Sequence, residues 1–276
     1  MVTAVTSALG SVLAAKGMKS ASSSVAAFYS VLTQAVVLTA ILMTRLPLFN
    51  WLAVAYFALG GVLALGLGRL LNFAAMRSIG VARTSAIIGS NPVLTTLLSI
   101  ILLAEVPLIS TMSGATLVAI GILLISGAEG FRLEKALIVG LFSALSYSMS
   151  NIVSKMGLMI EADPVLSAQA GALAGLLFIL FYIIVTQQHR SLKIDRPSLA
   201  YFAATGLVSS LGWVALMKAL EIGVVSVVTT IVYSYPLFIL FFSRSFLRDE
   251  KLSMRIVAGS VLVVVGVAVV TLFKLI

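Results

Sequence analysis

The chain contains no cysteine and a single histidine, so two common kinds of chemistry are excluded. Without cysteine there are no disulfides and no thiolate metal ligands. His189 falls in a predicted loop and cannot build a histidine-based metal site alone. We therefore expect neither a metal nor a cofactor.

Acidic residues are also scarce, and all nine lie in predicted loops or near the ends of apolar runs. A reaction centre inside a membrane needs paired carboxylates, a Ser–His pair or metal ligands, and the apolar runs contain none of these. We therefore expect that the protein is not an enzyme. Exporters that exchange protons for cations rely on a buried carboxylate, so a multidrug cation/proton antiporter is disfavoured.

Charge is rare and apolar sequence is abundant: 10% of the 276 residues are charged and 61% are hydrophobic. A soluble domain has about 25% charged residues. Apolar runs of about 20 residues match the hydrocarbon thickness of a bilayer. Such runs cover residues 2–15, 25–44, 51–68, 166–186 and 256–273. We expect a multi-pass integral membrane protein of the plasma (cell inner) membrane, with the lipid bilayer as a partner.

The net charge of +9 does not indicate a nucleic-acid partner, because the basic residues are scattered through short connections and form no stripe. Thirteen Lys and Arg residues lie in the connections after the odd-numbered predicted spans, and four lie on the other side. The positive-inside rule then places both termini outside. Lys155 and Lys218, near span ends, are expected to extend towards the interface.

The apolar runs and the turn residues between them predict ten spans, which form two halves of five. They cover residues 2–16, 24–44, 50–77, 81–104, 110–127, 134–157, 164–186, 197–220, 224–247 and 253–275. The first repeat is 1–127, the linker 128–133 and the second repeat 134–276. Five spans per half invert the second half relative to the first. The fold class we expect is therefore all-α integral membrane, with ten transmembrane helices in two inverted five-helix repeats.

Residues repeat between the halves at offsets of 143 to 145 positions. Gly80, Pro92, Glu105, Gly114 and Gly121 recur as Gly223, Pro236, Glu250, Gly259 and Gly266. The glutamates are expected to cap or pair at helix exits. The glycine pairs, seven residues apart, are expected to allow close helix packing, and such faces also serve in dimers.

With these repeats the segments "AAMRSIGVARTSAIIGSNPVLTTLL" and "KALEIGVVSVVTTIVYSYPLFILFF" resemble the two halves of an EamA-type transporter, in the drug/metabolite transporter superfamily. The resemblance covers essentially the whole chain. It implies ten helices in two inverted halves around a central cavity, and the movement of small metabolites, often outward. It also implies cytoplasmic termini, opposite to the charge count, so the orientation stays open.

Arg69 is the charged residue deepest in a predicted span. An ionised guanidinium in hydrocarbon costs at least about 2.5–3.5 kcal/mol, so Arg69 should face a cavity or a partner. There it would attract a carboxylate or a phosphate. The alternative is that Arg69 snorkels or bonds to helix-end carbonyls. Asn72 lies about one turn further along the same face.

Two prolines, Pro92 and Pro236, occupy matching places and are predicted hinges, since a mid-span proline weakens a helix. The alternative is an inert kink. The residues predicted to bind substrate in the cavity are Arg69, Asn72, Asn91, Tyr147, Asn151, Trp213 and Tyr233. The serines of the span 134–157 are expected mainly to pack helices together.

The function we expect is transport of a small polar metabolite, an amino acid or another zwitterionic or anionic solute, outward and by alternating access. The alternative is a lipid-linked or nucleotide-sugar carrier or flippase of the same superfamily. The expected partners are a small-molecule substrate and the bilayer, without nucleic acid, and a homodimer is left open.

Overall fold

The computed structural model describes residues 1–44, 49–103, 109–126, 135–188, 192–223, 225–233, 235–236, 238–239, 241–242 and 253–272. Within these ranges the regular elements are helices, and no strand occurs. The predicted linker 128–133 and the predicted helix-exit residues Glu105 and Glu250 lie outside the described residues.

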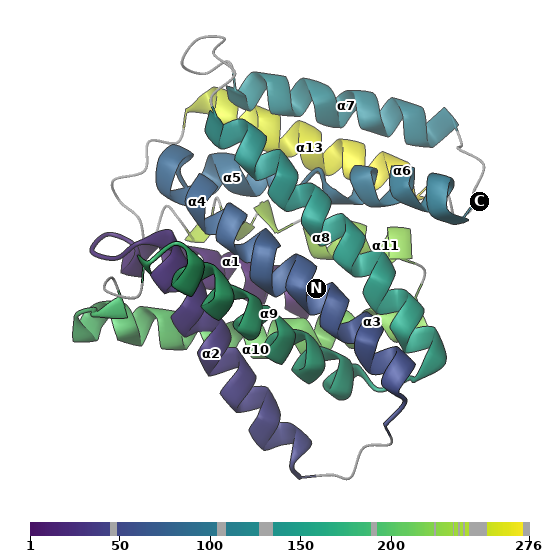
Figure 1. Cartoon of the computed structure of the whole chain (residues 1–276). Helices are drawn as coiled ribbons and strands as arrows, with labels where there is room; N and C mark the ends of the chain where they lie inside the picture. Colours follow the sequence, from purple (N-terminus) through teal and green to yellow (C-terminus); the bar gives the residue numbers. More distant parts are fainter. Residues whose placement is uncertain are drawn as a thin grey trace.

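The helices follow the apolar runs closely. They are α1 (Val2–Gly17), α2 (Ser23–Leu42), α3 (Trp51–Gly61), η1 (Val62–Gly68), α4 (Arg69–Ile79), α5 (Val81–Ile88), α6 (Asn91–Leu103), α7 (Ile109–Ser126), α8 (Lys135–Ile160), α9 (Pro164–Val185), α10 (Arg196–Ile222), α11 (Val225–Tyr233) and α13 (Met254–Leu272). In Figure 1, α7 and α13 lie side by side at one end, α2, α9 and α10 lie at the other, and α8 runs between them.

Among the described residues, five helical segments are long and apolar enough to cross a membrane. They are Ser23–Leu42, Trp51–Ile79, Lys135–Ile160, Pro164–Val185 and Arg196–Ile222. Val2–Gly17 and Met254–Val269 are apolar but shorter. The described residues therefore support a helical protein with several membrane-crossing helices, and the ten-span inverted arrangement stays a prediction.

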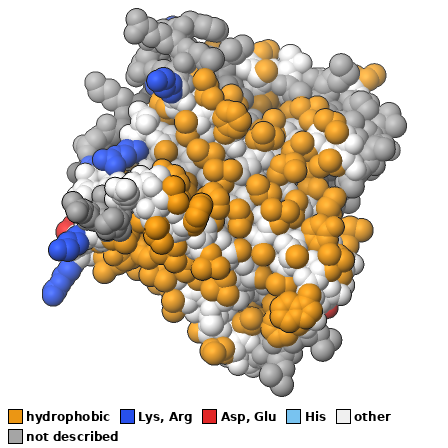
Figure 2. All heavy atoms as spheres, viewed as in Figure 1, with side chains coloured by type: hydrophobic (Ala, Val, Ile, Leu, Met, Phe, Trp, Pro, Cys, Tyr) orange, Lys and Arg blue, Asp and Glu red, His pale blue; other side chains and the backbone are white. Residues whose placement is uncertain are grey.

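The outer surface is apolar, as expected where lipid surrounds a protein. Figure 2 shows hydrophobic side chains across one broad face, with Lys and Arg side chains at one edge. Phe142 on α8 is 58% exposed, and Leu177 and Phe181 on α9 are each 65% exposed. Exposure of such large apolar groups to water would be costly, and the bilayer removes that cost.

The two ends of α10 hold the ends of α1 and α8. Ser20, just after α1, donates to Asp195 Oδ1 over 3.0 Å, and Asp195 caps the N-terminus of α10. Hydrogen bonds from Ser198 and Ser20 hold the pKa of Asp195 below its ordinary value. Lys155 Nζ, on α8, donates to the Leu220 carbonyl at the other end of α10 over 2.6 Å. The C-terminal ends of α1 and α8, which correspond in the repeat, thus lie at opposite ends of a helix about 40 Å long.

Glycines pack α7 against α13. An added Cβ at Gly121 would lie 2.7 Å from the Gly259 carbonyl, and one at Gly266 would lie 2.7 Å from the Gly114 carbonyl. Backbones this close leave no room for a side chain. The predicted packing face is therefore used within the chain. A homodimer stays a prediction, and its interface would have to form on a surface other than this glycine face.

Candidate substrate cavity

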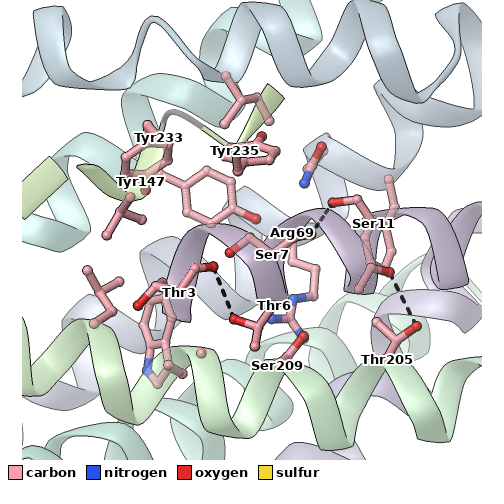
Figure 3. Close-up of a pocket in the computed structure, with 18 residues that line it drawn as sticks. Thr3, Thr6, Ser7, Ser11, Arg69, Tyr147, Thr205, Ser209, Tyr233 and Tyr235 are labelled. Atoms are coloured by element: carbon pink, nitrogen blue, oxygen red, sulfur yellow. Dashed lines mark hydrogen bonds between the residues drawn. The ribbon is translucent and has the colours of Figure 1, made fainter. Parts of the chain in front are cut away.

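A cavity of about 100 Å³ lies between α1, α4, α8, α10 and α11. Five of the seven predicted binding residues line it: Arg69, Asn72, Tyr147, Trp213 and Tyr233. In Figure 3, Tyr147, Tyr233 and Tyr235 lie above Arg69, Ser7 and Ser11 lie to its two sides, and Ser209 and Thr205 lie below it. The cavity therefore brings side chains from both halves of the chain to one basic group.

Arg69 owes its position to an irregular helix. η1 is a π-helix directly before Arg69, and π-helical turns often mark functional sites. Serines of α8 donate to backbone carbonyls along this stretch: Ser143 to Gly68 over 2.8 Å, and Ser146 to Leu63 over 2.6 Å. Inside a membrane backbone carbonyls must find donors within the protein, and these serines supply two such donors. The α8 serines thus hold helices together, as predicted, and fix the turn that carries Arg69.

The Arg69 side chain is 8% exposed and has neutral partners. Its Nη1 donates to Gln34 Oε1 over 3.1 Å. The Tyr147 hydroxyl interacts with both Arg69 and Asn72. Neither contact cancels the charge of the guanidinium, so its attraction for an anion in the cavity is preserved.

Trp213, on α10 in the second half of the chain, lines the same cavity as Arg69. Its indole Nε1 is buried and has no hydrogen-bond partner among the described residues. A buried donor without an acceptor costs about 1–3 kcal/mol. The Trp213 side chain therefore contributes an apolar ring to the cavity wall and an indole N–H without a partner among the described residues.

Asn91 and Asn151 do not line the cavity and are buried behind it. Asn91 Nδ2 donates to the Ala144 carbonyl over 2.9 Å, and Asn151 Nδ2 donates to Asn91 Oδ1 over 3.2 Å. Asn151 also donates to the Tyr233 hydroxyl over 3.4 Å. Asn151 therefore lies one contact away from the cavity and supports Tyr233 within it, and Asn91 lies one contact further away and supports Asn151.

Hydroxyl side chains from α1 and α10 make up much of the polar wall. They are Thr3, Thr6, Ser7, Ser11, Thr205 and Ser209. Several donate within their own helix, as Thr6 does to the Val2 carbonyl over 2.9 Å and Ser11 to the Ser7 carbonyl over 2.8 Å. Their oxygen lone pairs remain available as acceptors. None of these residues, nor Tyr235, was among the predicted cavity residues, although Ser7 and Ser11, four positions apart in the sequence, share one face of a helix.

Each predicted hinge proline follows an interruption in a helix, and the two interruptions lie against each other. Pro92 is the second residue of α6, after the break at Gly89–Ser90, and Pro236 follows α11. The Ser90 hydroxyl donates to the Ile87 carbonyl over 2.6 Å at the first break. An added Cβ at Gly89 would lie 3.0 Å from Pro236 Cγ. The two breaks therefore touch each other, beside the cavity residue Tyr235.

Comparison with models of known protein families assigns the chain to a family. The model of the EamA-like transporter family matches residues 1–127 and 134–272. The chain belongs to this family. It is therefore a member of the drug/metabolite transporter superfamily and a multi-pass integral membrane protein. No curated protein matches the chain.

Solved structures also match this EamA-like transporter. One, described only as "Crystal structure of protein", has a TM-score of 0.72 and 17% sequence identity. The match covers 99% of this chain and 96% of the other. At this identity the likeness shows the fold alone.

Proposed function

We propose that this EamA-like transporter exports a small polar metabolite that carries a carboxylate or another anionic group, an amino acid or an organic acid, by alternating access across the plasma membrane. The observation that carries the proposal is Arg69, a buried cation in the wall of a cavity, whose partners among the described residues are the neutral side chains of Gln34 and Tyr147. An anionic group on the substrate would satisfy both its charge and its free donors.

The arrangement of the chain supports alternating access. The family model matches twice, over residues 1–127 and 134–272, and the corresponding ends of α1 and α8 lie at opposite ends of α10. Two inverted halves around one cavity form a site that can open to either side. Arg69 from the first half and Trp213 from the second would then contact the substrate from opposite halves of the chain.

The alternative, a lipid-linked or nucleotide-sugar carrier, needs a lateral route from the bilayer to the cavity. An apolar groove of about 340 Å³ lies between α2 and α9, along Val36, Ala40, Leu173 and Leu176. It shares no lining residue with the cavity at Arg69. This geometry favours a water-soluble substrate over a lipid-linked one.

The test is release from proteoliposomes loaded with radiolabelled amino acids, organic acids and a nucleotide sugar. We expect selective release of a small carboxylate. Arg69→Gln should lower affinity for it by about tenfold, because about 1.4 kcal/mol of charged hydrogen bonding is lost. Lys218→Gln, which removes an exposed cation 2.6 Å from Glu221 outside the cavity, is the control. Release of a cation alone, or an unchanged affinity in Arg69→Gln, would contradict the proposal.

A further inference from the structure

Gln34 lies directly behind Arg69 and outside the cavity wall. It is on α2, is fully buried at 0% exposure, and is not among the residues that line the cavity. Its Oε1 accepts a hydrogen bond from Arg69 Nη1 over 3.1 Å. Gln34, which does not line the cavity, therefore holds Arg69, which does.

The other end of the Gln34 amide is unsatisfied. Gln34 Nε2 is buried and finds no hydrogen-bond partner within the described part of the chain. A buried donor left without an acceptor is destabilising, so an apolar residue would be expected here if packing alone decided the choice. The hydrogen bond that the Gln34 amide oxygen accepts from Arg69 explains why a glutamine stands at this position.

We propose that Gln34 sets the charge preference of the cavity by holding Arg69 with a neutral acceptor, which orients the guanidinium without cancelling its charge. The proposal rests on the proposed function, in which Arg69 attracts an anionic substrate. A carboxylate at position 34 would make the same hydrogen bond but would form an internal ion pair. The cavity would then lose its attraction for anions.

The charge of the cavity can be measured without knowing the substrate, because Trp213 lines it. The chain has two tryptophans, and Trp51→Phe leaves Trp213 as the only indole. In purified protein we would quench Trp213 fluorescence with iodide, with caesium and with neutral acrylamide. The ratio of the iodide to the caesium quenching constant reports the local potential, and acrylamide reports accessibility.

Gln34→Glu should lower the iodide-to-caesium ratio by about 25-fold and leave acrylamide quenching unchanged. The basis is that two unit charges 4 Å apart in water interact by about 1 kcal/mol, which lowers iodide quenching about fivefold and raises caesium quenching about fivefold. Arg69→Gln should lower the ratio to a similar extent. The matched control is Gln169→Glu, which changes another buried glutamine, on α9, that hydrogen-bonds to Thr39 instead. It should leave the ratio unchanged.

The outcomes separate this proposal from the proposed function. If Arg69→Gln lowers the ratio and Gln34→Glu does not, Gln34 does not set the charge preference, while the role of Arg69 stands. If Arg69→Gln leaves the ratio unchanged, Arg69 is not the charge of the cavity and both proposals fail. If Gln169→Glu lowers the ratio as much as Gln34→Glu, the effect is not specific to the Arg69 contact and the proposal is overturned.

Gln34→Met keeps the proposal testable if the glutamate variant does not fold. Methionine fills a similar volume but offers no carboxamide acceptor. The guanidinium then loses its charged hydrogen bond and is no longer held towards the cavity, so the ratio should fall by about twofold. An unchanged ratio in Gln34→Met would overturn the proposal.

Discussion

Lys155 shows how a lysine near the end of a membrane helix can have a structural use. Such a side chain can extend to the interface, as we expected, or it can bond to another helix. Lys155 Nζ donates to the carbonyls of Leu220, Glu221 and Gly223, over 2.6, 3.3 and 3.1 Å. A cation at the C-terminus of α10 also meets the negative end of its dipole. The interaction joins α8 to α10.

We predict that Lys155→Met lowers the stability of the protein by about 1.5–3 kcal/mol, the typical contribution of charged hydrogen bonds. The measurement is thermal unfolding of the purified protein in detergent. Lys218→Met is the matched control. Lys218 pairs on the surface with Glu221 over 2.6 Å and is 59% exposed, so its loss should change stability by less than about 1 kcal/mol. Equal effects of the two variants would argue against a special role for Lys155.

At the scale of the element, the broken helices are the parts of this transporter best suited to move. Their breaks, at Gly89–Ser90 before Pro92 and at Tyr235 before Pro236, touch each other beside the cavity. A helix that lacks backbone hydrogen bonds at such a point bends at lower cost than a continuous one. A change of state in the cavity would be transmitted through these breaks.

We predict that Pro92→Ala and Pro236→Ala each slow transport several-fold and leave substrate affinity nearly unchanged, because the breaks serve the movement and the prolines do not line the cavity. Initial rates in proteoliposomes over a range of substrate concentrations measure both quantities. Pro164→Ala, at the first turn of α9 after its cap Asp163, is the control and should leave the rate unchanged. Inert kinks would give full rates in all three variants.

The elements could be predicted from the sequence more fully than the cavity. Apolar run lengths and breakers such as Pro164 located the helices within a few residues, and the cost of a buried charge identified Arg69. The faces of the helices were harder, because α2, α7 and α9 are apolar all round and give no sign of which side is inside. On α10, Thr205 and Ser209 line the cavity but were not predicted, and the predicted residues Asn91 and Asn151 lie buried outside its lining. Gln34, the lone amide within its apolar run, was a signal that could have been used.

At the scale of the whole molecule, the absence of cysteine allows the topology to be tested directly. Ser20 follows α1 and Ala162 follows α8, and both residues are exposed. We predict that Ser20→Cys and Ala162→Cys, introduced singly, are labelled by a membrane-impermeant thiol reagent from opposite sides. The reason is that the corresponding ends of α1 and α8 lie at the two ends of α10. Labelling of both from one side would contradict inverted halves.

The same two variants decide which way the transporter faces. Ser20 lies on the side where most Lys and Arg residues of the sequence fall, so the positive-inside rule predicts that it is cytoplasmic. In intact cells the reagent should then label Ala162→Cys and spare Ser20→Cys. The opposite pattern would match the cytoplasmic termini that the resemblance to the family implies. The basic connections would then face outward, and the packing of the repeats rather than the loop charges would have to set the orientation.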